Sequence, residues 1–178
     1  MLCGTNPNSS FEAHTDLVKK LDYECELAVV LGKDAKDVPA GQTKDYVFGY
    51  TILNDVSARD VQTAHKQWYF GKSLDGFTPI GPCIVTADEF DTYPPKLPIR
   101  CFVNGEKRQD SNTGLQIFDI DHVIAELSQG MTSPAFPEKG GAVSFYSLFA
   151  SRYRSYPPYI SRRQTISKPL ARALLRLY

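Results

Sequence analysis

The sequence predicts an α+β domain that is rich in β-strands. Four runs of branched and aromatic residues, separated by Gly, Pro and Asp clusters, are typical of strands. One segment has the spacing of an amphipathic helix, and neither a glycine-rich nucleotide loop nor an internal repeat is present. With 178 residues the chain has the length of one ordinary domain, or of a domain with an appendage, and can bury a sizeable core.

The strands come first along the chain. Residues 1–20 are polar and rich in turn-forming residues, so we expect an irregular N-terminal segment there. Strands are expected at residues 25–32, 46–55, 79–87 and 97–105. Asn104 and Gly105 both tolerate a positive φ, so they predict a type I′ turn that joins the last of these strands to residues 106–110.

Two helices are expected. The stronger one spans residues 119–130, with Asp119 or Asp121 as its N-cap and Gly130 at its C-terminal end. Its apolar face consists of Ile120, Val123, Ile124 and Leu127. A shorter helix is expected to begin at Asp55 or Ser57 and to run through "SARDVQTAHKQW", residues 57–68.

The charge balances over the whole chain but divides unevenly along it. There are 20 acidic and 20 basic residues, so no global field favours nucleic acid or an anionic membrane. Residues 133–178 hold eight basic residues and one acidic residue, a net charge of +7, which leaves −7 on residues 1–132. The basic segment has no recognisable nucleic-acid-binding fold, so we expect neither nucleic acid nor a membrane as a partner.

Cysteine usage and the N-terminus indicate a compartment. Cys3, Cys25, Cys83 and Cys101 have no C-x-x-C spacing, which disfavours a zinc site and is typical of thiols in a reducing environment. The first residues lack the basic start and apolar core of a secretory signal. No apolar run reaches the roughly 18 residues of a membrane helix. We therefore expect an intracellular protein, in the cytoplasm or the mitochondrion.

Two glutamates stand one residue apart in an apolar run, "DYECELAVVLGK". In a strand, Glu24 and Glu26 point to one side and Cys25 points to the other. Two buried carboxylates repel each other unless they share a proton or a cation, so the pair is a candidate for metal ligation. From this stretch alone the alternative, a solvated pair on an edge strand, stays open.

A second group of candidates lies within residues 49–82. Asp55 ends an apolar strand at a polar turn, a place where a carboxylate can face a cleft. Arg59 and Gln62 follow at helical spacing, so all three are expected to line one side of a short helix, and Lys72 precedes the next expected strand. The carboxylates of both groups make an oxygen-only ligand set that suits Mg²⁺ or Mn²⁺, with Ca²⁺ as an alternative.

Five segments in order resemble the successive motifs of the fumarylacetoacetate hydrolase family. They are "DYECELAVVLGKDAKDV", "GYTILNDVSARDVQ", "QWYFGKSLDGFTPIGP", "VNGEKRQDSNT" and "ELSQGMT", and the resemblance extends over about residues 21–132. The metal ligands that the resemblance implies are Glu24, Glu26 and Asp55. The substrate-binding residues that it implies are Arg59, Gln62 and Lys72, with Lys72 also catalytic.

The resemblance also implies a fold and a chemistry. Residues 21–132 are expected to form the mixed β-sandwich or roll of the family's C-terminal catalytic domain, incomplete at its C-terminal strands. The implied activity is divalent-metal-dependent enolate chemistry on small 2-oxo or 1,3-dicarbonyl acids. This covers oxaloacetate tautomerisation or decarboxylation and C–C hydrolysis of acylpyruvates or fumarylpyruvate. A homodimer with a small 2-oxo acid substrate is implied. The alternative is an inactive, truncated member that acts as a binding or dimerisation module.

Both ends depart from the family pattern. Family hydrolases activate water with a histidine and a glutamate on an upstream segment, and the spacing of His14 and Glu12 does not match that pair. Residues 133–178 are rich in Ser, Arg, Tyr and Pro where the family has a closing strand. We expect a poorly ordered basic tail there, derived from an alternative reading frame or an unspliced intron. No water-activating pair is assigned, so the resemblance does not extend to hydrolysis that depends on such a pair.

Overall fold

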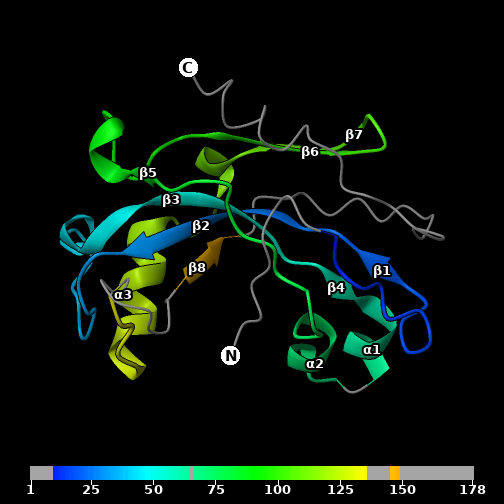
Figure 1. The fold of residues 1–178 in the computed structure, drawn as a ribbon. Coiled ribbons are helices and arrows are strands. Elements are labelled where there is room, and N and C mark those ends of the chain that lie inside the picture. The colour runs from blue at the N-terminus through cyan, green and yellow to red at the C-terminus, as the bar shows by residue number, and fades with distance from the viewer. Residues whose placement is uncertain (1–9, 65, 136–144, 149–178) are drawn as a thin grey trace.

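A central antiparallel sheet with the strand order β5-β3-β2-β8 organises the chain (Figure 1). The computed structural model describes residues 10–64, 66–135 and 145–148. The strands are β1 (Leu21–Asp22), β2 (Cys25–Leu31), β3 (Val47–Asn54), β4 (Ser57–Ala58), β5 (Val85–Thr86), β6 (Pro98–Val103), β7 (Glu106–Asn112) and β8 (Phe145–Leu148). The helices are α1 (Arg59–Ala64), α2 (Trp68–Lys72) and α3 (Ile120–Gly130), and short 3-10 turns lie at Thr43–Tyr46, Ala87–Glu89 and Thr113–Leu115. Among the described residues, no helix has the length and apolar character needed to cross a membrane.

The pairing of β2 with β3 forms the centre of this sheet. Their register runs from Cys25 opposite Asn54 to Val30 opposite Gly49. All seven residues of β2 are buried, and after Glu26 its sequence is accordingly a continuous apolar run rather than an alternating one. Gly49 allows β5 to approach closely, since a Cβ there would lie 2.4 Å from the carbonyl oxygen of Val85. The strands predicted at residues 25–32 and 46–55 are thus present as β2 and β3, and the structure shows that they pair.

The main hydrophobic core joins the sheet to α3 and to the β6–β7 hairpin. Alternate residues of β2, including Leu27 and Val29, belong to one cluster with Ile99 of β6 and with Ile120 and Ile124 of α3. The helix begins after Asp119, whose side chain accepts the backbone N–H of residue 122 at 2.9 Å. The predicted helix, its N-cap and its buried face are confirmed.

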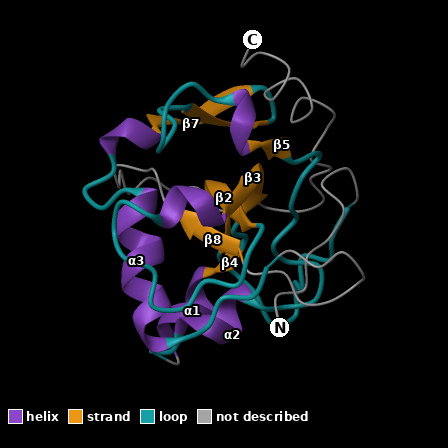
Figure 2. Ribbon diagram, turned by 90° about the vertical axis from the view of Figure 1, so that its left-hand side faces the viewer, coloured by secondary structure: helices purple, strands orange, loops and turns teal. Residues whose placement is uncertain are grey.

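A second, smaller core underlies α1 and α2. It consists of Val18, Val56, Ala58, Val61, Leu74 and Phe77. In both views the α1–α2 pair and the β6–β7 hairpin lie on opposite sides of the central strands (Figures 1 and 2). A Cβ at Gly71 would lie 2.8 Å from the Cβ of Gln62, so glycine is what lets α2 rest directly on α1.

The predicted hairpin is confirmed, whereas the strand expected just before it is largely absent. Asn104 and Gly105 have φ values of 53° and 82°, as a type I′ turn requires, and they join β6 to β7. Of residues 79–87 only Val85–Thr86 forms a strand, with a further isolated bridge between Ile80 and Leu53. The prolines in this segment have no N–H to donate to a ladder, which interrupts the pairing.

The second helix differs from expectation at both of its ends. It begins at Arg59 rather than at Asp55 or Ser57, because Ser57–Ala58 pairs with Leu21–Asp22 as a short strand. Asp55 therefore lies in a connection outside the helix. The expected helix stops at Ala64, and a separate helix, α2, carries Lys72 as its last residue rather than as the lead into a strand.

The C-terminal segment also differs in part from expectation. Phe145–Leu148 pairs antiparallel with Leu27–Val30 and so occupies the second edge of β2. A strand edge offers unpaired N–H and C=O groups, and this edge accepts a strand whose own sequence has no clear alternation. The remainder of the predicted basic tail, residues 136–144 and 149–178, lies outside the described residues.

Candidate metal centre

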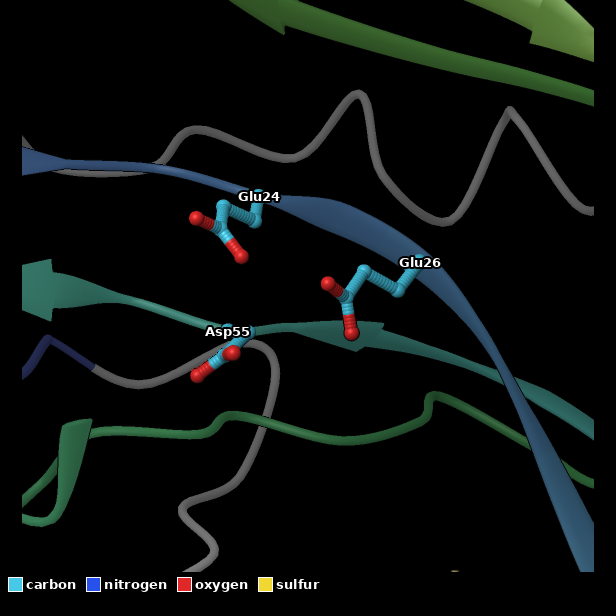
Figure 3. Close-up of side chains that lie close together, drawn as sticks. All are labelled: Glu24, Glu26 and Asp55. Atoms are coloured by element: carbon cyan, nitrogen blue, oxygen red, sulfur yellow. The ribbon is translucent and has the colours of Figure 1, made fainter. Parts of the chain in front are cut away.

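Three carboxylates from two adjacent strands meet at the end of the sheet. Glu24, directly before β2, and Glu26, within β2, project toward Asp55, which directly follows β3 (Figure 3). Each residue offers one carboxylate oxygen, and these oxygens all lie within 4.8 Å of one another. The side chains of the two glutamates share a side of the strand because strand residues two apart point the same way. Both glutamates are about 95% buried, which excludes the alternative of a solvated pair.

Burial makes this cluster electrostatically costly. Removal from water, followed by the charges of Asp55 and Glu24, raises the pKa of Glu26 to about 9. Burial also raises the pKa of Asp55, although the hydrogen bond from Lys72 opposes that shift. Carboxylates this close need a shared proton or a cation to remain together.

Lys72 supplies one positive charge. Its ammonium donates to Oε2 of Glu24 at 3.0 Å, to Oγ of Ser57 at 3.0 Å and to the carboxylate of Asp55. Burial by itself lowers the pKa of Lys72, but hydrogen bonding to Asp55 and the neighbouring negative charges outweigh it, so the pKa is raised. The lysine is therefore protonated at neutral pH.

Arg59 supplies the second positive charge. Its Nε donates to Asp22 at 2.9 Å, one terminal nitrogen donates to Oε1 of Gln62 at 3.1 Å, and the other contacts the carboxylate of Glu24. The guanidinium thus bridges β1, β2 and α1. Gln62 is 5% exposed and reaches the cluster through this contact with Arg59.

The structure brings all six sequence-predicted residues into one connected group, and the carboxylates in it fit a divalent cation. Their donors are oxygen atoms only, as Mg²⁺ and Mn²⁺ prefer, and a cation would remove the repulsion that raises the pKa of Glu26. One detail of the prediction is wrong: Asp55 does not share a helix face with Arg59 and Gln62, because α1 begins at Arg59. The roles of these residues stay predictions.

Two residues that bind the cationic side chains of the site, Asp22 and Ser57, were not predicted from the sequence. Asp22 accepts a hydrogen bond from Arg59, and Ser57 accepts one from Lys72. Asp22 is two residues from Glu24, and Ser57 is two residues from Asp55. Strand residues two apart share a face, and this spacing could have indicated both residues. Outside the carboxylate cluster, Nε2 of His14 lies 2.8 Å from the carbonyl oxygen of Asp75, and the His14 ring meets the ring of Phe77 edge-on. These contacts tie His14 to the smaller core.

Comparison with known proteins agrees with the family resemblance. The profile of the fumarylacetoacetate (FAA) hydrolase C-terminal domain matches residues 5–136. Oxaloacetate tautomerase YisK of Bacillus subtilis is 44% identical over 124 residues, which cover 70% of this chain and 41% of YisK. A protein of Staphylococcus saprophyticus without an assigned activity is 46% identical over 125 residues, again 70% of this chain and 41% of the relative.

Solved structures that resemble this chain agree with the family match. A fumarylacetoacetate hydrolase from Exiguobacterium antarcticum is 46% identical, with a TM-score of 0.70 over 73% of this chain and 46% of that one. A 5-carboxymethyl-2-hydroxymuconate delta-isomerase from Mycobacterium smegmatis has a TM-score of 0.61 at 43% identity, over 65% of this chain and 45% of that one. The chain spans about two fifths of the length of the curated relatives that it matches. By its profile match, its relatives and its fold, this chain belongs to the fumarylacetoacetate hydrolase family and has the fold of that family's C-terminal domain.

Proposed function

We propose that the chain is the catalytic domain of a divalent-metal-dependent enzyme that acts on small 2-oxo or 1,3-dicarbonyl acids. The observation that supports this most directly is the buried cluster of Glu24, Glu26 and Asp55, with oxygens within 4.8 Å of one another. Such a cluster costs folding energy and is retained where function needs it. The similarity to an oxaloacetate tautomerase and to an isomerase of a hydroxymuconate favours enolate chemistry of a keto acid.

In this proposal Glu24, Glu26 and Asp55 hold the cation, Mg²⁺ or Mn²⁺. A cation bound there would supply Lewis-acid polarisation of a carbonyl oxygen and stabilise developing negative charge. Lys72 lies against two of these carboxylates, and in this proposal its ammonium would donate to a substrate oxygen beside them. The lysine thereby binds substrate and carries a proton at Nζ.

Arg59 would orient the far end of the substrate. Asp22 holds Nε of its guanidinium, and the two terminal nitrogens, which contact Gln62 and Glu24, are the ones that a substrate carboxylate would engage in their place. Arginine suits this role because its planar fork matches a carboxylate in two parallel hydrogen bonds. A homodimer and a cytoplasmic or mitochondrial location stay predictions.

Thermal unfolding with and without Mn²⁺ plus oxalate tests the proposal. Oxalate presents two adjacent oxygens, as a 2-oxo acid does, and a ligand at 100 times its Kd adds about 2.7 kcal/mol to the free energy of unfolding. We expect a clear rise in Tm for the wild-type chain and none for Glu26→Gln. Glu106→Gln, which removes an exposed carboxylate paired with Arg108, is the matched control.

Turnover is then measured as oxaloacetate tautomerisation, oxaloacetate decarboxylation and acylpyruvate cleavage. Metal-dependent turnover in any of the three that Glu26→Gln abolishes supports the enzyme. A wild-type chain that binds Mn²⁺ without turnover in all three assays would favour the alternative, an inactive family member that acts as a binding or dimerisation module. Turnover that Glu26→Gln leaves intact would refute the ligand assignment.

A further inference from the structure

Two side-chain amides hold the backbone at the start of β2. The N–H of Glu24 donates to Oδ1 of Asn54 at 3.1 Å, and the N–H of Cys25 donates to Oε1 of Gln109 at 2.8 Å. Asn54 belongs to β3 and Gln109 to β7, so two different strands bind two consecutive peptide groups. These peptide groups lie in the segment that carries Glu24 and Glu26.

Asn54 completes a ring of hydrogen bonds between two of the proposed ligands. The residue after it, Asp55, donates its N–H to the carbonyl oxygen of Glu24 at 2.8 Å. Both backbone polar groups of Glu24 are therefore bound to residues 54 and 55. Asn54 is itself anchored, because its N–H donates to the carbonyl oxygen of Pro79 at 3.0 Å. The ring sets the separation between the backbones of Glu24 and Asp55.

Gln109 attaches the same segment to the hairpin. It lies opposite Cys101 in the β6–β7 register, and the thiol of Cys25 contacts the carbonyl oxygen of Arg100 at 3.6 Å. The hairpin thus meets Cys25 at both its N–H and its side chain. Since Cys25 is the residue between the two glutamates, these contacts restrict the rotation that would change how Glu24 and Glu26 face each other.

We propose that Asn54 and Gln109 are positioning residues for the carboxylate cluster. By holding the amides of Glu24 and Cys25, they keep the three carboxylates at the spacing that a divalent cation requires. This inference rests on the proposed function, since it concerns the same site. Loss of a group that orients metal ligands weakens metal binding roughly 10- to 100-fold. A role in fold stability alone leaves metal affinity unchanged.

The test compares Mn²⁺ affinity among variants of the full chain by electron paramagnetic resonance of the free ion. Asn54→Ala and Gln109→Met are each expected to raise the Kd for Mn²⁺ roughly tenfold or more. Hydrogen exchange at the amides of Glu24 and Cys25 is expected to become faster in the respective variant. Because Gln109→Met keeps the size of the side chain and acts on another strand, it provides the test if Asn54→Ala does not fold.

Asn112→Ala is the matched control. Oδ1 of Asn112 accepts the N–H of Gly114 at 2.8 Å, so the variant loses the same kind of bond without touching a carboxylate of the cluster. We expect its Mn²⁺ affinity to equal that of the wild-type chain. Unchanged affinity in both Asn54→Ala and Gln109→Met, with faster exchange at Glu24 and Cys25, would overturn this inference alone. Absence of Mn²⁺ binding by the wild-type chain would overturn the proposed function as well.

Discussion

Lys72 donates its ammonium hydrogens to the carboxylate of Asp55, so the residue proposed to bind substrate is also the ion-pair partner of a proposed metal ligand. The same nitrogen lies 3.0 Å from Oε2 of Glu24. The lysine therefore offsets part of the charge that a divalent cation would neutralise. The ammonium of Lys72 and a divalent metal ion would bind the same carboxylate oxygens, so we expect them to compete.

Replacing Lys72 by methionine is expected to tighten Mn²⁺ binding, on the order of tenfold or about 1.4 kcal/mol, because the competing ammonium is gone. Without metal, the variant is expected to be less stable by roughly 1–3 kcal/mol, since charged hydrogen bonds are lost and carboxylates are left unpaired. Calorimetric titration and urea unfolding measure the two effects. Lys107→Met, which removes an exposed partner of Asp110, serves as control. Weaker Mn²⁺ binding in Lys72→Met would contradict the competition.

The stability of the metal-free chain is expected to fall as pH rises. Glu26 has a pKa of about 9 in the folded state against about 4.5 in the unfolded state, so the folded state holds more protons between these values. Its contribution is complete below about pH 4.5 and is lost as pH rises toward 9. Urea unfolding of the wild type and Glu26→Gln between pH 6 and 9 checks this. Parallel pH profiles for the two proteins would show that Glu26 does not titrate in this range.

Metal binding is expected to release a proton at pH 7. The carboxyl group of Glu26 is protonated at that pH in the metal-free chain and must ionise to serve as a ligand. Affinity for Mn²⁺ should therefore rise with pH up to about 9, the pKa of Glu26. Titration calorimetry in two buffers of different ionisation enthalpy counts the protons released. A pH-independent Kd would mean that Glu26 stays outside the coordination shell.

Gly71→Ala is expected to lower both the stability of the chain and its proposed turnover, although Gly71 itself is not a site residue. The added Cβ would lie 2.8 Å from the Cβ of Gln62 and 2.9 Å from the carbonyl oxygen of Ala58, which pushes α2 away from α1. Overpacking of this kind costs about 1–3 kcal/mol and moves Lys72, the next residue. Thermal unfolding and the proposed turnover assay measure the two effects. Gly130→Ala, where a Cβ meets nothing within 4 Å, should leave both unchanged.

The parts of the fold with local signals could be predicted from the sequence. The hairpin depends on the positive φ of Asn104 and Gly105, and α3 depends on its N-cap and its apolar period. The pairing of Glu24 with Glu26 follows from the strand period alone. Each of these features is decided by residues within a few positions of one another.

The parts set by contacts between distant segments could not be predicted in this way. Helix α2 has no side-chain N-cap bond, and its aromatic residues are more typical of a strand; it forms where Gly71 can rest on Gln62. The contact of Asp22 with Arg59 depends on the pairing of β1 with β4. Tertiary packing between distant segments determines both features, so neither can be predicted from a short segment of the sequence.

The two hydrophobic cores divide the charged groups of the site between them. Glu24 and Glu26 lie at or just before the start of β2, in the larger core, whereas Lys72 and Arg59 belong to the helices that cover the smaller one. Small cores with few buried residues open locally at a lower free energy than the elements at the centre of a sheet. A transient opening of the smaller unit would uncover the acidic groups while the sheet stays intact. Solvent and ions would then reach the buried carboxylate cluster on the timescale of local unfolding rather than of global unfolding.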